Sequence, residues 1–461
     1  MKIGLLPLYL KLYDDRVSSE TSQKRNESFY ALIANELEKR GLSVVTTPIC
    51  RIASEFKVAV SNFEKAGVDA IVTLHLAYSP SLESAEALAS SDLPVIVLDT
   101  TPTYSFDQWQ KPGELMYNHG IHGVQDMCNL LIRMNKPFVI EAGHWEESDV
   151  LNRVLAHVRS ASVATAMQNA RIGRIGPAFK GMGDFDVAAD VLKKTIGIET
   201  IDCSTAQLRE LLPAPDDKRI DEELAEDQKI FDTSGLPLET HRNSLRIGLA
   251  VRNLIERERL TGFSANFMNF NRDDGMPTLP FLEASKAMAR GIGYAGEGDV
   301  LTSALTGALL SVYPETSFTE MFCPDWKNNT IFLSHMGELN YKLVNGKAKL
   351  SEKALPYIPI DPPAVASGCF KAGPACLVNL APMPEDEFLL LVAPVSMLDI
   401  KGKDRMDGMV RGWFKPELPL NDFLAEYSEC GGTHHSALTY NVSADELIAF
   451  ADLMGWDSVI L

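Results

Sequence analysis

Long hydrophobic runs are missing from this sequence of 461 residues. No stretch approaches the ~20 apolar residues that a membrane-spanning helix needs. The apolar stretch Ile3–Pro7 is too short for the hydrophobic part of a signal peptide, and it is typical of a first β-strand. We therefore expect a cytoplasmic protein that has no membrane partner.

The sequence has fewer positively charged than negatively charged residues. The chain has 43 Lys and Arg residues against 62 Asp and Glu residues, which gives a formal net charge of −19 at pH 7. A field of that sign repels nucleic acids and anionic membrane surfaces. We expect no nucleic-acid partner, and a neutral small molecule or a cation fits the charge better.

Two common cofactor motifs are also absent. The seven cysteines are scattered and form no Cys-x-x-Cys pair, so neither a structural zinc site nor a redox dithiol is indicated. No Gly-x-Gly-x-x-Gly follows the first expected strand, Lys2–Leu6, which argues against a bound dinucleotide.

The first third of the chain alternates short apolar runs with amphipathic stretches, a pattern typical of a parallel sheet covered by helices. The expected strands are Lys2–Leu6, Leu42–Thr47, Ala70–His75, Val95–Asp99 and Phe138–Ala142. In such doubly wound sheets, ligands bind beyond the carboxyl ends of the strands.

We expect three domains, because the pattern of residue types changes along the chain. Residues 1–168 and 169–315 each have the strand-and-helix pattern, so we predict two doubly wound α/β domains. Residues 316–461 are richer in β-branched and aromatic runs separated by Pro, Gly and Asn, which predicts a mainly β C-terminal domain. Its expected elements include strands at Thr330–Leu333, Tyr341–Val344 and Phe388–Val392, and one late helix at Ala444–Met454.

Metal-competent side chains occur in segments where solvation alone does not explain them. These side chains are Glu297, Glu320, His335, His434 and His435. They lie in Gly293–Asp299, Thr316–Met321, Ser334–Met336 and Gly431–Ser436. Oxygen and imidazole ligands without thiolate suit Mn²⁺, Co²⁺ or Mg²⁺ better than a structural zinc.

A metal ion with open positions suits the interconversion of an aldose and its ketose. An ion that binds O1 and O2 of a sugar acidifies the hydrogen on C2, and a carboxylate can then relay the proton through an ene-diol. Glu297 and Glu320 are the predicted pair for this relay, because two carboxylates near one ion can hold different protonation states.

Each of these residues also has a simpler interpretation. Glu297 and Asp299 lie among glycines before an expected helix, where acidic residues are favoured by the helix dipole. His335 alone is more often a structural histidine. Neighbouring strand residues face opposite ways, so we assign His435 as the metal ligand and His434 as a substrate contact or a support for the ligands.

In their order along the chain, these segments resemble the L-arabinose isomerase family. The matching motifs are Tyr294–Asp299, Thr316–Phe318 with Glu320, Ser334–Met336 with Glu338, and Gly431–Gly432 with His434 and His435. The resemblance implies a subunit with two α/β domains and a β-rich C-terminal domain, assembled as a trimer or hexamer. It also implies Mn²⁺ held by Glu297, Glu320, His335 and His435, with the two glutamates as acid and base.

The resemblance further implies which residues contact the sugar. His119, in Asn118–Gly120, matches a histidine-glycine step that the family places at the active site of a neighbouring subunit. Taken alone, His119 and His122 are better explained as residues that open a helix. Tyr78 resembles the aromatic residue of an aromatic-Ser-Pro loop, and Phe270 an aromatic residue that lines the site. Phe179 and His434 complete the predicted set.

The sequence departs from the family in two segments. The family has Gly-Ser-Gln-His-Leu-Tyr-Gly after the first strand, whereas Leu6–Tyr13 lacks the glutamine that would touch the sugar. Gly176–Phe185 also differs from the usual Gly-Asp-Asn-Met-Arg stretch. The substrate is therefore open between L-arabinose, another pentose and a deoxyhexose. A sugar-binding protein or an inactive homologue on the same fold is the alternative of a different class.

Overall fold

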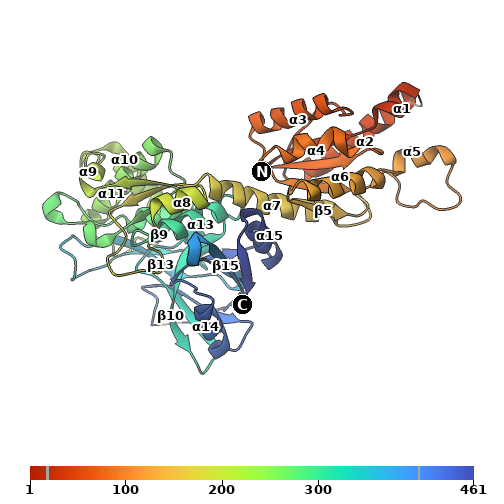
Figure 1. Cartoon of the computed structure of the whole chain (residues 1–461). Coiled ribbons are helices and arrows are strands. Elements are labelled where there is room, and N and C mark those ends of the chain that lie inside the picture. The colour runs from red at the N-terminus through yellow and green to blue at the C-terminus, as the bar shows by residue number, and fades with distance from the viewer. Residues whose placement is uncertain (17–19, 403–404) are drawn as a thin grey trace. The chain divides into compact units, whose positions relative to one another are not determined.

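The computed structural model describes residues 1–16, 20–402 and 405–461 (Figure 1). By compactness the chain divides into two units, Met1–Ser162 and Val163–Leu461, and the division falls inside helix α7 (Val150–Gln168). The ranges 169–315 and 316–461, which we predicted as separate domains, form separate sheets within the second unit. Among the described residues, no helix is both long enough and apolar enough to span a membrane.

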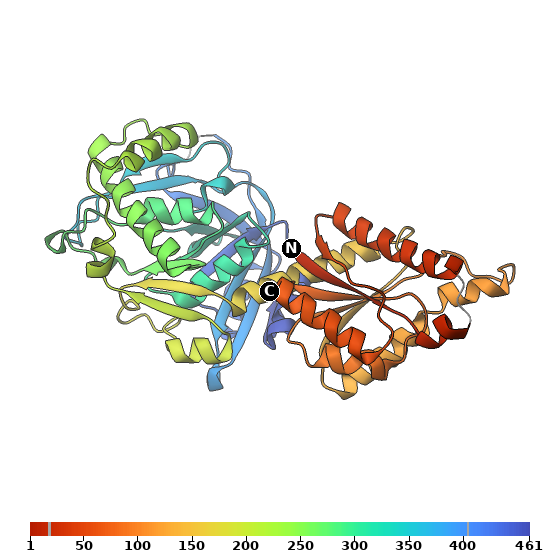
Figure 2. The same cartoon turned by 90° about the horizontal axis from the view of Figure 1, so that it is seen from above.

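The first unit is built on a parallel sheet with the strand order β2-β1-β3-β4-β5. Its strands are β1 (Lys2–Leu8), β2 (Ser43–Val45), β3 (Ala70–His75), β4 (Val95–Asp99) and β5 (Phe138–Ala142). Helices lie on both faces of this sheet (Figure 2). The helices of this unit are α1 (Lys11–Arg16), α2 (Glu20–Lys39), α3 (Ala53–Ala66), α4 (Ser81–Ala89), α5 (Leu115–Asn118) and α6 (Ile121–Arg133). The predicted doubly wound arrangement is confirmed here.

Helix α3 illustrates how the sequence pattern produces this packing. Phe56, Val60 and Phe63 recur at helical spacing, and all three are buried in the core of the first unit. A Cβ atom at Gly4 of β1 would lie only 2.5 Å from the ring of Phe63, so glycine lets the helix approach the sheet. The helix ends at Gly67, whose φ of 61° is left-handed.

The second unit begins with a parallel sheet of strand order β7-β6-β8-β9. Its strands are β6 (Arg171–Ile175), β7 (Glu199–Cys203), β8 (Gly262–Ala265) and β9 (Gly293–Gly296). The accompanying helices are α8 (Ala189–Thr195), α9 (Thr205–Arg209), α10 (Lys218–Ile230), α11 (Leu238–Glu258), α12 (Phe281–Met288) and α13 (Val300–Leu310). Helix α13 is buried almost all round, because it packs against this sheet and also against strands of the next one.

The C-terminal part is mainly β, as predicted. Its strands are β10 (Thr316–Asp325), β11 (Thr330–Ser334), β12 (Lys349–Glu352), β13 (Ala364–Cys369), β14 (Gly373–Pro382), β15 (Phe388–Met397), β16 (Val410–Pro416), β17 (His435–Tyr440) and β18 (Asp457–Ile460). The pairing runs from β16 through β11, β10, β17, β14 and β15 and returns to β16, so these strands close into a barrel. Helix α15 (Ala444–Met454) is the predicted late helix.

Two expectations for this part were wrong. Tyr341–Val344 is not a strand, because the side chain of Asn340 accepts the backbone N–H of Lys342 and caps a short 3₁₀ helix instead. A second helix, α14 (Leu420–Glu429), precedes the late one. It is amphipathic, and its buried residues lie at helical spacing: Leu420, Phe423 and Tyr427.

Candidate metal centre

The barrel register brings three of the predicted residues together. Glu320 of β10 pairs with His435 at the start of β17, and on its other side it pairs with Ser334, which precedes His335. His435 Nε2 lies 3.0 Å from Glu320 Oε1, and His335 Nε2 lies 3.3 Å from the same oxygen. Two residues far apart in the sequence therefore reach one carboxylate through strand pairing.

Glu297 arrives from the parallel sheet, one residue beyond β9. Its φ of 66° is left-handed, which is uncommon for a residue with a side chain and typical of functional sites. Two backbone hydrogen bonds hold this turn: the N–H of Glu297 donates to Ala265, and its carbonyl accepts the N–H of Phe179 at 2.8 Å. A Cβ atom on the next residue, Gly298, would lie 2.7 Å from the Cα of Ala178, so only glycine fits there.

The side chain of Glu297 completes the cluster. Its Oε2 lies 3.3 Å from His435 Nε2 and 3.7 Å from His434 Nε2. Ligand atoms of Glu297, Glu320, His434 and His435 all lie within 4.8 Å of one another. Three of the four predicted metal ligands, Glu297, Glu320 and His435, therefore lie together in the structure. The fourth, His335, contacts Glu320, and His434 is a further member of the cluster.

Two buried atoms in this cluster make no well-aligned hydrogen bond among the described residues, although one of them, His435 Nε2, lies 3.0 Å from Glu320 Oε1. They are Oε2 of Glu297 and Nε2 of His435. Buried polar atoms are normally satisfied, so an unpaired carboxylate oxygen facing an unpaired imidazole nitrogen calls for a ligand between them. Carboxylates and imidazoles fit a divalent cation such as Mn²⁺.

Each of the two buried histidines has a carboxylate behind it. His435 Nδ1 lies 2.8 Å from Asp299 Oδ2, and His335 Nδ1 lies 2.7 Å from Glu338 Oε2. Such pairs hold the proton on Nδ1 and leave Nε2 directed at a metal. The hydroxyl of Tyr294 donates to the other oxygen of Glu338 at 2.9 Å. Sequence reasoning assigned no such role to Glu338 or Tyr294, which entered only through the family motifs.

Asp299 also has the structural role that its position suggested. Its Oδ1 accepts the backbone N–H of Thr302 at 2.8 Å and caps helix α13. One carboxylate therefore serves both a helix and a histidine. Glu297, by contrast, does not cap this helix.

The charges in the cluster stabilise one another. Burial alone would raise the pKa of Glu297, but His434 and His435 outweigh it and lower that pKa to about 2. The pKa of Glu320 is lowered for the same reason by His335 and His435. Burial would lower the pKa of His335, but Glu338 and Glu320 raise it to about 10. Both glutamates are thus ionised at neutral pH.

His434 is held by a residue that the sequence analysis did not single out. One oxygen of Asp184, Oδ2, accepts the backbone N–H of His434 at 3.0 Å and lies 2.7 Å from its Nδ1. The next residue, Phe185, stacks on His435 with the ring centroids 4.9 Å apart and the planes at 11°. The only sequence signal was that Gly176–Phe185 departs from the family pattern.

The predicted aromatic contacts differ in exposure. Phe179 is half-buried, its backbone N–H donates to the carbonyl of Glu297, and its ring lies 5.5 Å from that of Phe267. Phe270 is completely buried in a hydrophobic cluster of the second unit, so its side chain faces the core. Phe267, which is half-buried, is the aromatic residue that lies next to Phe179.

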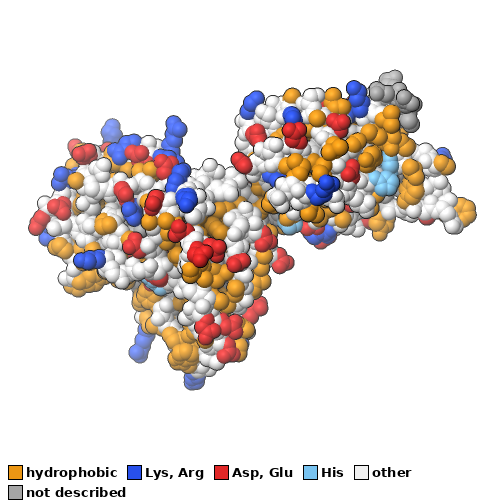
Figure 3. All heavy atoms as spheres, viewed as in Figure 1, with side chains coloured by type: hydrophobic (Ala, Val, Ile, Leu, Met, Phe, Trp, Pro, Cys, Tyr) orange, Lys and Arg blue, Asp and Glu red, His pale blue; other side chains and the backbone are white. Residues whose placement is uncertain are grey.

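The other two predicted substrate contacts belong to the first unit, whereas the metal centre belongs to the second. His119 follows α5, and its Nε2 lies 2.9 Å from the hydroxyl of Tyr13. Tyr78 follows β3, and its hydroxyl donates to Asp126 at 3.2 Å. Histidine side chains reach the surface of this unit (Figure 3), where His122 is exposed. The roles of His119 and Tyr78 remain predictions.

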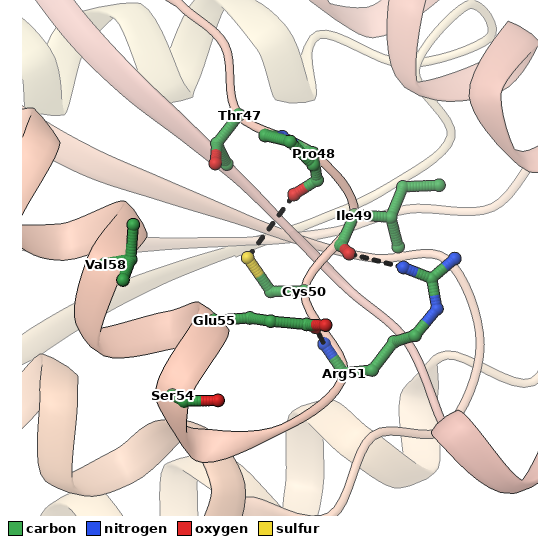
Figure 4. Close-up of a pocket in the computed structure, with 8 residues that line it drawn as sticks. All are labelled: Thr47, Pro48, Ile49, Cys50, Arg51, Ser54, Glu55 and Val58. Carbon is green, nitrogen blue, oxygen red and sulfur yellow. Dashed lines mark hydrogen bonds between the residues drawn. The ribbon is translucent and has the colours of Figure 1, made fainter.

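A separate pocket of about 370 Å³ lies in the first unit (Figure 4). Cys50, the only thiol among its lining residues, donates to the carbonyl of Pro48 at 3.3 Å. Burial raises the pKa of Cys50 to about 12, so this thiol is not a nucleophile at neutral pH. The lining residues are Thr47, Pro48, Ile49, Cys50, Arg51, Ser54, Glu55 and Val58.

Comparison with known proteins gives the family of the chain. Residues 174–313 match the L-arabinose isomerase central domain, and residues 315–457 match the L-arabinose isomerase C-terminal domain, which together make up more than half of the chain. L-arabinose isomerase 1 of Bacillus licheniformis is 23% identical over 90% of this chain and 85% of its own. L-arabinose isomerase of Geobacillus stearothermophilus is 24% identical over 96% and 91%.

Solved structures give a weaker likeness. The periplasmic binding protein component of the arabinose ABC transporter from Shewanella sp. ANA-3 is 12% identical and covers 68% of this chain and 84% of its own. Its TM-score is 0.17, and no functional argument follows from a value this low.

Proposed function

The chain belongs to the L-arabinose isomerase family of aldose–ketose isomerases, and we propose that it interconverts an aldose and its ketose at a divalent metal ion. The observation that carries the metal is the convergence of Glu297, Glu320, His335 and His435 around buried atoms for which the described part of the chain offers no well-aligned hydrogen bond. These four residues would hold the ion. Mn²⁺ is the proposed metal, with Co²⁺ or Mg²⁺ as substitutes.

When bound, the ion supplies Lewis-acid polarisation of the sugar carbonyl and the neighbouring hydroxyl. The chain supplies the proton transfers. A glutamate removes the hydrogen on C2 as a proton while O1 gains a proton, which gives an ene-diol; a proton then leaves O2 and one is delivered to C1, which gives the ketose. Glu297 and Glu320 are the proposed proton carriers, because both carboxylates lie in the centre where the sugar would bind.

L-Arabinose, which gives L-ribulose, is the first substrate to expect, because the curated relatives carry that name. Another pentose or a deoxyhexose is the second candidate, because Leu6–Tyr13 lacks the glutamine of the family loop. We further propose a homo-oligomer, trimeric or hexameric, in which His119 and Tyr78 of one subunit approach the sugar bound by another. A cytoplasmic location is part of the same proposal.

A panel of L- and D-aldopentoses and deoxyhexoses tests this function. Each sugar is incubated with Mn²⁺-loaded protein and with protein stripped by EDTA, and ketose formation is measured. Turnover of any aldose that disappears on stripping supports the isomerase and identifies its substrate class. Stoichiometric Mn²⁺ binding without turnover on any sugar would favour a sugar-binding protein or an inactive homologue.

The proton relay has its own test. In deuterium oxide, a relay through the two glutamates exchanges the transferred hydrogen with solvent, so the ketose carries deuterium on C1. Complete retention of the original hydrogen over many turnovers would favour a direct hydride shift.

A further inference from the structure

The segment Gly176–Phe185 contacts residues of the metal centre near its start and at its end. Near its start, the N–H of Phe179 holds the carbonyl of Glu297 at 2.8 Å. At its far end, Asp184 binds His434, and Phe185 stacks on His435. Two consecutive residues therefore serve two consecutive histidines, and the segment that departs from the family pattern supports the centre directly.

The contact between Asp184 and His434 fixes an orientation as well as a distance. A single carboxylate oxygen receives the backbone N–H at 3.0 Å and lies 2.7 Å from Nδ1 of the same residue. The ring is therefore held relative to its own backbone. Because Nδ1 faces Asp184, the other nitrogen, Nε2, faces Glu297 at 3.7 Å.

We propose that Asp184 is a positioning residue for the isomerisation. Through His434 it keeps Nε2 directed at the side of the centre where the sugar oxygens bind, so that this nitrogen can hydrogen-bond a sugar oxygen as its charge changes. This inference rests on the proposed function. It assigns His434 to the sugar and leaves the metal to the neighbouring residue, His435.

The distances support this division between the two histidines. His435 Nε2 lies 3.0 Å from Glu320 and 3.3 Å from Glu297, in the middle of the carboxylates. His434 Nε2 comes no nearer to Glu297 than 3.7 Å, and its side chain is 39% exposed, whereas that of His435 is fully buried. The more exposed imidazole is the one that an arriving sugar can reach.

An ordinary surface ion pair would not carry this role. The Asp184 side chain is 37% exposed, and exposed ion pairs add little to stability. Its loss should therefore leave the fold intact and change the behaviour of the site. Loss of a purely structural ion pair would instead lower the unfolding temperature, or change neither stability nor activity.

Three variants test the proposal. Asp184→Ala removes the acceptor, Asp184→Asn keeps an oxygen that can accept both hydrogen bonds, and Asp186→Asn removes the same charge from an exposed residue two positions along. For each variant we would measure kcat and KM, the affinity for Mn²⁺ by titration calorimetry, the binding of L-arabinitol, and the unfolding temperature. L-Arabinitol lacks the carbonyl group, so it reports binding without turnover.

Loss of a residue that orients an active-site group typically costs about 10- to 100-fold. We expect Asp184→Ala to lower kcat/KM by that factor, Asp184→Asn to lose clearly less, and Asp186→Asn to match the wild type. The Mn²⁺ affinity and the unfolding temperature should stay unchanged in all three. Wild-type kcat/KM in Asp184→Ala would overturn the proposal, and so would an Mn²⁺ affinity that falls in step with activity, because His434 would then be a metal ligand.

A crystal structure of Mn²⁺-loaded Asp184→Ala separates this inference from the proposed function. The expected result is a His434 ring that has rotated or that occupies more than one orientation. A ring in its original place would overturn the positioning role, whether or not the wild type turns over any sugar.

Discussion

Glu338→Gln should weaken metal binding while leaving the shape of the centre unchanged. Glu338 is fully buried, and its two oxygens face two donors, His335 Nδ1 at 2.7 Å and the Tyr294 hydroxyl at 2.9 Å. A glutamine can satisfy both: its oxygen accepts from His335, and its NH₂ group donates to the Tyr294 oxygen, since a phenol also accepts. The substitution therefore removes the negative charge behind His335 and little else.

That charge makes the facing imidazole a better metal ligand. Residues in this position typically contribute about 10- to 100-fold in metal affinity, or about 1.4 to 2.7 kcal/mol. We expect the dissociation constant for Mn²⁺ to rise by that factor in Glu338→Gln, with the unfolding temperature of the metal-free protein nearly unchanged. Calorimetric titration with Mn²⁺ at constant pH measures the effect.

Tyr294→Phe is the matched control for this prediction. It removes the hydroxyl group that contacts Glu338 but leaves the carboxylate and its bond to His335 in place. Its effect on Mn²⁺ affinity should be clearly smaller than that of Glu338→Gln. Equal affinities in the wild type and Glu338→Gln would refute the reasoning, because His335 would then not depend on this carboxylate or would not bind the metal.

Two further substitutions test other parts of the account. Glu297→Gln should lower kcat by about 10²- to 10⁴-fold, the usual contribution of a proton-transfer group, with unchanged far-UV circular dichroism; retained activity at unchanged metal content would remove Glu297 from the relay. Glu223 lies away from the centre. Burial would raise its pKa, but Arg252 and Lys286 lower it to about 2. The contribution of this carboxylate to the stability of the fold is therefore fully present above pH 4.5 and is lost as the pH falls towards 2. The free energy of unfolding, measured with urea, should fall between pH 4.5 and pH 2 in both proteins, but by on the order of 2 kcal/mol less in Glu223→Gln than in the wild type. Equal falls in the two proteins would contradict this.

Local patterns in the sequence were sufficient for much of the fold. Strand β4 opens with the continuous apolar run Val95–Leu98, because both faces of a parallel sheet are covered. The 3₁₀ helix at Tyr341–Leu343 was missed because the aromatic and aliphatic residues of Tyr341–Val344 do not reveal that the Asn340 side chain will bond two residues ahead. Helix α14 was missed although its apolar residues recur at helical spacing.

The candidate site, too, could be predicted from the sequence only in part. Its metal-competent residues stand out by type and by their small neighbours, but only the register of β10 with β17 shows that Glu320 meets His435. Asp184 is 250 positions from His434, so nothing local could connect them. Phe270 and Phe267 are both aromatic residues just beyond one strand, and only the packing shows that Phe270 faces the core.

The central claim is that one divalent ion at this centre is required for aldose–ketose conversion. The most direct measurement follows metal content and ketose formation on the same sample, as EDTA removes the metal and Mn²⁺ is then added back. Turnover should fall to background as the metal is removed and return in proportion to bound Mn²⁺, up to one ion for each chain. Turnover that persists after the metal is gone, or that is absent on every sugar with one Mn²⁺ bound to each chain, would contradict it.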